Sequence, residues 1–216
     1  MSRLRNSLLL AVLIISAAGC QSFLRSTRRA STPGPTARTV PISSPLIKQL
    51  VAAAIEQTGY TLSYDPAYVK LDYPGGDIPL ERGACSDVIV RAFRKDGIDL
   101  QKEVHEDMAR HFSAYPQKWG LAGPDSNIDH RRVPNLMTFF ERQGKDLSIT
   151  SNPQDYQPGD VVAWQLDGGA THIGMVTNIL SENGGGLQVV HNIGAGVRVE
   201  DVLFAWQIIG HYRYFK

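Results

Sequence analysis

The spacing of apolar residues changes near Lys145, and this change limits the chain to a mixed fold. Before Lys145 the apolar residues recur every three or four positions, as on one face of a helix. After it, short apolar runs alternate with Gly, Asn and Asp, which is typical of strands and turns. The pattern predicts an α+β fold in which N-terminal helices pack on an antiparallel β-meander. We expect helices at 44–59, 84–95, 100–112 and after Pro134, strands at 160–166, 171–179, 187–193 and 208–215, and an extended piece at 67–71.

The first 19 residues predict an export signal. Arg3 and Arg5 precede an apolar run from Leu8 to Ala18, which is about half of the ~20 residues that a helix needs to span a bilayer. The run closes on "SAAGC", which resembles a bacterial lipobox with alanine where leucine is usual, and this resemblance implies a lipid on Cys20. Gln21 then favours the inner leaflet of the outer membrane, facing the periplasm. Cleavage after a small residue, giving a soluble periplasmic protein, is the alternative.

Residues 20–43 predict a disordered basic tether, because they are rich in Ser, Thr, Pro and Arg and contain no acidic residue. The rest of the chain, 44–216, has the size of one domain with its own core. Without the six arginines that precede Ser44, 16 basic residues face 21 acidic ones, a net charge of −5. An acidic domain argues against nucleic acid as a partner. The oligomeric state does not follow from the sequence.

Cys85 is the only cysteine besides Cys20. If Cys20 carries a lipid, Cys85 has no partner for a disulfide in its own chain, so it is a candidate reactive thiol in an oxidising compartment. The alternative is a buried, inert small side chain. Cys85 falls in the first turn of the helix predicted at 84–95, where the backbone N–H groups and the helix dipole favour a thiolate. This position favours the reactive interpretation.

Two histidines lie on strands that a hairpin through "SENGGG" should place side by side. His172 begins "HIGMV" and His191 lies in "VVHNI". An imidazole near Cys85 is the usual base for a thiol nucleophile. Direct pairing of the two histidines would centre the turn at 181–182, ahead of the glycines, so the register stays open. The spacing lacks the close-set pairs of a structural zinc site, and we predict no metal or cofactor.

The motifs "GACSDVIVRAF", "PGDVVAW", "THIGMV" and "VVHN", in this order, resemble the NlpC-like cell-wall peptidases, a papain-like superfamily. Nearly the whole stretch from Tyr64 to Tyr214 resembles an uncharacterised bacterial domain-of-unknown-function family that is grouped with that superfamily. The phrases "LDYPGGDIPLERGACSDV", "DHRRVPNL" and "HNIGAG" carry this closer resemblance.

The resemblance implies a papain-like NlpC-type fold and a catalytic site. Cys85 matches the nucleophile, His172 the base, and His191 the residue that orients the base. Tyr73 lies at an offset where NlpC-like enzymes often carry a tyrosine that positions the nucleophile or stabilises the oxyanion. The backbone N–H of Cys85 is the other expected oxyanion donor.

Two features depart from the superfamily pattern or lie outside it. The usual Asp-Cys-Ser-Gly is replaced by Ala84, Cys85, Ser86 and Asp87, so we expect Asp87 to alter substrate contacts and to raise the thiol pKa, with Arg82 opposing it. In "DSNIDHRRVPNL", Arg131 and Arg132 are candidates to clamp a substrate carboxylate. An internal salt-bridge network is the equal alternative, and His130 is the fallback base.

The predicted function is hydrolysis of amide bonds in peptidoglycan stem peptides by a cysteine peptidase or amidase tethered in the periplasm. Peptidoglycan and, through the N-terminal lipid, the membrane are the expected partners. The alternatives are an acyl or amide transferase or an amidase acting on another envelope substrate, and a catalytically silent wall-binding lipoprotein. The identity of the bond does not follow from fold analogy.

Overall fold

The computed structural model describes residues 37–215, which form one compact unit. The predicted signal 1–19, Cys20 and the first part of the predicted tether lie outside these residues. Within the described range, no helix is long and apolar enough to cross a membrane.

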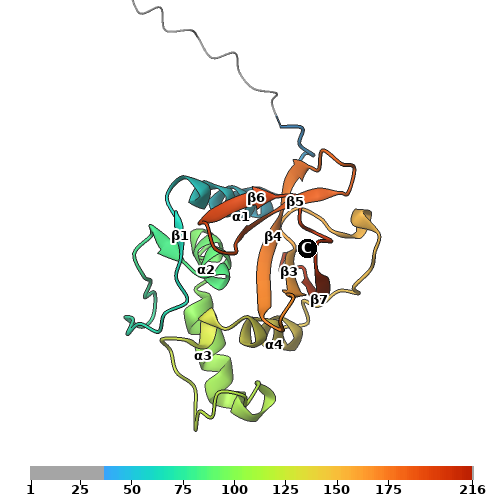
Figure 1. Cartoon of the computed structure of the whole chain (residues 1–216). Coiled ribbons are helices and arrows are strands. Elements are labelled where there is room, and N and C mark those ends of the chain that lie inside the picture. Colours follow the sequence, from blue (N-terminus) through green and yellow to red (C-terminus); the bar gives the residue numbers. More distant parts are fainter. Residues whose placement is uncertain (1–36, 216) are drawn as a thin grey trace, which may run out of the picture. The chain divides into compact units, whose positions relative to one another are not determined.

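A five-stranded sheet forms the C-terminal half, as the alternating pattern predicts (Figure 1). Its strand order is β6-β5-β4-β3-β7, and all neighbours pair antiparallel. The strands are β3 (Val161–Gln165), β4 (Thr171–Leu180), β5 (Leu187–Asn192), β6 (Val197–Glu200) and β7 (Gln207–Tyr212). Because helices come first and antiparallel strands follow, the α+β prediction is confirmed.

Four α-helices precede the sheet, and each begins where the sequence predicts a start. Ser44 caps α1 by accepting from the N–H of Ile47, and Asp99 caps α3 by accepting from the N–H of Gln101. Pro134 lies in the first turn of α4. The helices are α1 (Pro45–Glu56), α2 (Cys85–Lys95), α3 (Leu100–His111) and α4 (Val133–Arg142), with short 3-10 turns at Gln57–Gly59, Phe112–Ala114, Asp129–Arg131 and Pro153–Asp155.

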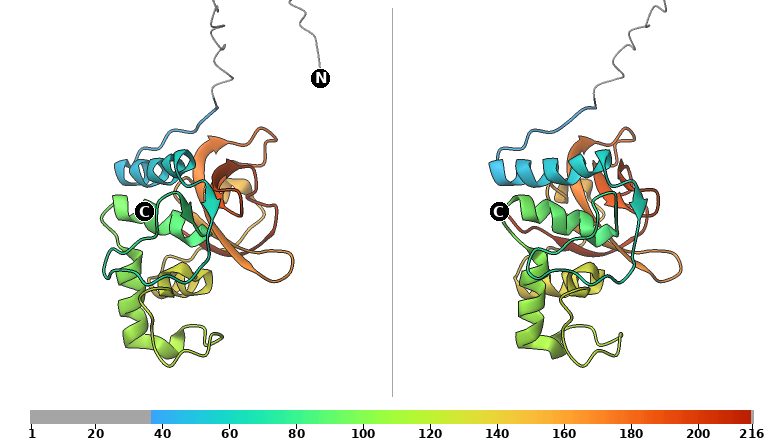
Figure 2. Two further views of the ribbon diagram at one scale, coloured as in Figure 1. Left: turned by 60° about the vertical axis from the view of Figure 1, so that its left-hand side comes forward. Right: turned by 90° about the vertical axis from the view of Figure 1, so that its left-hand side faces the viewer.

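The two faces of the sheet bury different clusters. On one face α2 packs against the sheet with α1 beside it (Figure 2), and side chains such as Ile173 and Met175 join Cys85 and Phe93 in the main core. On the other face Trp164 is the largest member of a smaller cluster closed by the segment between β6 and β7. Successive residues of a strand alternate between these clusters, as period two requires.

Three details differ from the sequence-based expectation. The sequence did not predict β6. Residues 67–71 form no strand; instead β1 (Ser63–Tyr64) pairs in parallel with β2 (Arg82–Gly83), which leads directly into α2. The packed unit begins before the predicted boundary at 44, because the N–H of Leu180 donates to the carbonyl of Arg38 and the N–H of Val40 to that of Asn178.

Candidate active site

Cys85 is the first residue of α2 and is 4% exposed. Ala84 has no side chain to cap the helix, and the carboxylate of Asp87 accepts from the Ala84 N–H at 2.6 Å instead. The thiol sulfur lies within hydrogen-bonding reach of three backbone N–H groups, those of Cys85, Ser86 and Ile173. The helix start is therefore joined to the sheet at the peptide unit that links His172 to Ile173.

Burial raises the pKa of the Cys85 thiol to about 11, and the nearby Asp87 carboxylate adds to this effect. The backbone N–H groups favour the thiolate but oppose the burial only in part. Arg82 forms an ion pair with Asp65 at 3.3 Å. The resting sulfur is thus a protonated thiol, and the thiolate expected from the helix start alone does not form, because loss of solvent outweighs the helix terminus.

The tyrosine that reaches the thiol is Tyr64, not Tyr73. Tyr64 and Cys85 line the same pocket, and burial together with the nearby thiol raises the pKa of Tyr64 to about 12. Tyr73 is 41% exposed and packs edge-on against His105 of α3, with ring centroids 5.0 Å apart. The offset of Tyr73 from Cys85 did not indicate proximity, because the segment between them folds back along α2 and α3.

His172 and His191 converge, as the hairpin predicts. Nε2 of His172 lies 2.8 Å from Nδ1 of His191, and both imidazoles are buried. The strands pair Met175 with Val190, which places His191 opposite Gly174 and diagonal to His172 on the same side. A Cβ on Gly174 would lie 3.1 Å from the His191 Cβ and 2.7 Å from Cγ1 of Val189. Gly174 is thus needed for the close approach of the two imidazoles.

A carboxylate that sequence reasoning missed completes this row. Oε2 of Glu200, on β6, lies 2.9 Å from Nε2 of His191. Burial lowers the pKa of His172 to about 3 and also lowers that of His191, although Glu200 opposes the second shift. The two rings pack against Trp164 and Trp206. Burial thus favours the neutral form of both histidines.

The histidine pair and the thiol lie on opposite faces of the sheet. His172 leaves β4 on the side of Trp164, whereas the next residue, Ile173, shares the main core with Cys85. Across residues 37–215, no hydrogen bond joins the thiol to either imidazole. The backbone N–H near the sulfur belongs to Ile173, the residue after His172. The structure therefore joins His172 to His191 but leaves Cys85 on the opposite face of the sheet.

Arg131 and Asp87 form an internal brace. The guanidinium makes a bidentate ion pair with the Asp87 carboxylate, with contacts of 2.9 and 3.0 Å, and donates to the carbonyls of Asp65 and Ala67. Both side chains are at most 4% exposed. The internal salt-bridge network that was the alternative for Arg131 is thus present, and Asp87 is its buried partner.

His130 is also internal to the fold. It is 2% exposed, and burial with the nearby arginines lowers its pKa to about 3. Its Nδ1 has no hydrogen-bond partner within the described part of the chain.

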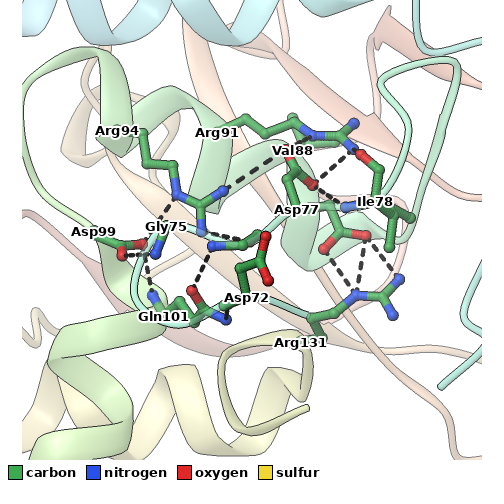
Figure 3. Close-up of polar contacts among 12 residues, drawn as sticks. Asp72, Gly75, Asp77, Ile78, Val88, Arg91, Arg94, Asp99, Gln101 and Arg131 are labelled. Carbon is green, nitrogen blue, oxygen red and sulfur yellow. Dashed lines mark hydrogen bonds and ion pairs between the residues drawn. The ribbon is translucent and has the colours of Figure 1, made fainter. Parts of the chain in front are cut away.

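A wider polar network fixes the loop that carries the chain into α2 (Figure 3). Arg91 of α2 binds the Asp77 carboxylate at 2.9 and 3.0 Å. Arg94, one turn later, donates to the carbonyl of Gly76 and to Asp99. Gln101 of α3 accepts from the N–H of Gly76 at 2.8 Å. These buried and half-buried contacts hold residues 72–83 against α2 and α3 and so position the start of α2.

A pocket of about 200 Å³ opens beside the thiol. Its wall contains no acidic residue; it is lined by Tyr64, Cys85, Trp119, Arg131, Arg132 and Thr171, with small apolar side chains between them. The Arg132 guanidinium lies over the Trp119 ring at 4.1 Å, and its Nη1 has no hydrogen-bond partner among the described residues. Arg131 is thus paired within the fold, whereas Arg132 has no ion-pair partner among the described residues.

A metal is not implied by this arrangement. Within 37–215, no three His, Cys, Asp or Glu side chains are grouped so that they can hold a metal ion.

Comparison with known proteins agrees with the resemblance to a bacterial domain-of-unknown-function family. The family model described as "Domain of unknown function (DUF1287)" matches residues 51–214. Over 162 residues the chain is 61% identical to a protein of Escherichia coli (strain K12) named "Uncharacterized protein YijF", and the match covers 75% of this chain and 78% of that protein. The protein whose buried thiol and histidine pair are described above therefore belongs to the DUF1287 family.

Proposed function

We propose that this protein is a thiol hydrolase, related to the NlpC-like peptidases, that cleaves amide bonds in peptidoglycan stem peptides. The observation that supports it best is the placement of Cys85. The thiol lies at a helix start, in the wall of a pocket, and packs against β4, whose His172 is hydrogen-bonded to His191 of β5. A nucleophile, a candidate base and a residue that orients the base are the parts that acyl transfer to a thiol requires.

The proposed reaction starts from a neutral thiol and a neutral imidazole. Sγ of Cys85 bonds to the amide carbon while its proton passes to Nδ1 of His172, whose Nε2 is engaged by His191. The proton then moves to the departing amine, the C–N bond breaks and a thioester remains. Water, deprotonated by His172, cleaves the thioester and returns the proton to sulfur. Because His172 leaves β4 on the face opposite to Cys85, this step requires the start of β4 to turn over on substrate binding so that Nδ1 reaches Sγ.

The developing oxyanion has two donors in this scheme. They are the backbone N–H of Cys85 and the hydroxyl of Tyr64, both of which lie at the sulfur. In this proposal Tyr64 takes the role that the family resemblance implied for Tyr73.

Arg132 is the proposed substrate-binding residue. Stem peptides carry carboxylates, and a guanidinium that lines a pocket without acidic side chains and has no ion-pair partner among the described residues favours a carboxylate ligand. Trp119 beneath the guanidinium fixes its plane and offers an apolar surface to the rest of the substrate.

The proposed location is the periplasm, with a lipid on Cys20 holding the protein at the inner leaflet of the outer membrane. Mass spectrometry of the mature N-terminus tests this directly. A diacylglyceryl-cysteine at position 20 supports the anchor, and an unmodified N-terminus supports the soluble alternative.

Digestion of purified sacculi tests the hydrolase. Wild-type protein should release muropeptides that a Cys85→Ala variant does not, and a Ser86→Ala variant serves as the matched control at the next position. The shortened stem peptides identify the bond, and amine adducts in place of free acids would indicate transfer. Identical profiles for wild type and Cys85→Ala would contradict the hydrolase.

A catalytically silent wall-binding protein is the second candidate, and the raised thiol pKa favours it. It predicts that sacculi retain wild type and Cys85→Ala equally and release nothing. Iodoacetamide labelling adds a second measurement, because a silent thiol should stay slow at neutral pH even with wall fragments present, whereas a substrate-assembled site should react faster.

A further inference from the structure

Glu200, His191 and His172 form a hydrogen-bonded row across three strands, and the donor and acceptor of each hydrogen bond in this row can be assigned. Glu200 on β6 contacts His191 on β5 at 2.9 Å, and His191 contacts His172 on β4 at 2.8 Å. Glu200 stands opposite Val189, two residues from His191, so the three side chains lie diagonally on one side of the sheet. The register alone brings them together, since 28 positions separate His172 from Glu200.

The carboxylate decides which nitrogen carries hydrogen. An ionised carboxylate only accepts, so the Nε2 of His191 must donate to Glu200. A neutral imidazole has one N–H, so the Nδ1 of His191 is bare and accepts. The Nε2 of His172, facing that Nδ1, must then donate, and the lone pair of His172 is left on Nδ1.

The burial of both rings supports neutral imidazoles rather than an imidazolium. Both imidazoles are buried, at 1% and 2% exposure, among tryptophan rings. A charged His191 would place an N–H at both of its nitrogens and would force His172 to accept through Nε2, moving the His172 hydrogen to Nδ1. Arg198, which pairs with His191 across β5 and β6, is exposed and makes no contact with the row among the described hydrogen bonds.

We propose that Glu200 is a positioning residue that fixes the tautomers of His191 and His172, so that Nδ1 of His172 is the free base. The catalytic meaning of this assignment rests on the proposed hydrolase, whereas the tautomers themselves do not. The bare Nδ1 is the nitrogen that the proposed reaction needs, because Nε2 is held by His191. The role resembles that of the buried carboxylate in a Ser-His-Asp triad, transmitted here through a second imidazole.

The test is the ¹⁵N spectrum of histidine side chains in the full-length protein, assigned with His172→Gln and His191→Gln variants. Wild type should show a protonated Nε2 and a bare Nδ1 on both rings. Glu200→Ala should give mixed tautomers on both, and Glu200→Gln, whose amide oxygen still accepts, should restore the wild-type pattern in part. Arg198→Gln is the matched control on the same strand and should change nothing.

Hydrolysis provides the functional measurement. If the sacculus assay succeeds, Glu200→Ala should lower kcat at least about tenfold with little change in KM, because the base is misprotonated while the pocket is intact. A protonated Nδ1 on His172 in wild type, or unchanged tautomers in Glu200→Ala, would overturn the proposal. If the wild-type protein shows the expected tautomers but hydrolyses nothing, the proposed hydrolase activity is wrong and the role of Glu200 in fixing the tautomers still holds.

Discussion

Replacing Asp87 with Asn separates the two interpretations of the arginine segment. The change keeps the size of the side chain but leaves the Arg131 guanidinium, only 2% exposed, without its counter-charge. Removing one partner of a buried ion pair costs about 3–5 kcal/mol, because the remaining charge is buried and uncompensated. In a domain of this size that corresponds to a fall in Tm of roughly 6–20 °C. The loss is large but within the total stability of about 5–15 kcal/mol that is usual for a domain.

Urea unfolding followed by tryptophan fluorescence measures the effect. An Arg82→Gln variant is the matched control, since its ion pair with Asp65 is long, at 3.3 Å, and the arginine side chain is 47% exposed. That variant should lose at most about 1 kcal/mol. If Asp87→Asn is as stable as Arg82→Gln but no longer binds sacculi, Asp87 and Arg131 contact the substrate and the reasoning from the buried brace is wrong.

Three further predictions concern single side chains. Gly174→Ala should lose about 1–3 kcal/mol, because its Cβ would meet Val189 and His191; Gly59→Ala, which meets nothing within 4 Å, should be neutral or slightly stabilising in the same urea titration. His130→Leu should make stability less dependent on pH between about 6.5 and 3. In that range His130 is protonated in the unfolded state but not in the native state, because its native pKa is lowered to about 3. The free energy of unfolding of wild type therefore falls by about 1.4 kcal/mol for each pH unit of acidification, and the leucine variant lacks this loss. Equal slopes for the two proteins would show that His130 is not buried as described. Arg132→Gln should raise the KM for carboxylate-bearing muropeptides at least tenfold with stability within about 1 kcal/mol of wild type, and an unchanged KM would remove Arg132 from substrate binding.

Local sequence signals predicted the helices, because residues that cap or begin a helix act through contacts within its first turn. The caps at Ser44 and Asp99 and the proline at 134 act within one turn, and the sequence contains all of that information. The strand β6 was missed because four residues of alternating Val, Arg, Val and Glu between glycine-rich turns and a loop are too short to stand out. The capping role of Asp87 could have been predicted, because an acidic residue three positions after the N-cap often accepts from the N–H of the N-cap residue.

The candidate site depended on long-range geometry that a single sequence does not carry. The choice between Tyr64 and Tyr73 follows from the path of the loop that Arg91 and Arg94 hold, not from distance along the chain. The thiol pKa follows from how deeply α2 packs against β4, which overrides the helix terminus. The contact of Glu200 with His191 depends on the register of β5 and β6, and β6 was not predicted.

The pairing of residues 38–40 with β4 has a mechanical consequence. Tension applied along the chain from its N-terminal side reaches the backbone hydrogen bonds at Asn178 and Leu180 before it reaches α1. The load is therefore taken up at the far end of the strand whose beginning carries His172, while the helix that bears Cys85 is spared direct pulling. If the proposed anchor holds the N-terminal side of the chain, a pull on it would load the end of β4 and leave the packing around Cys85 unchanged.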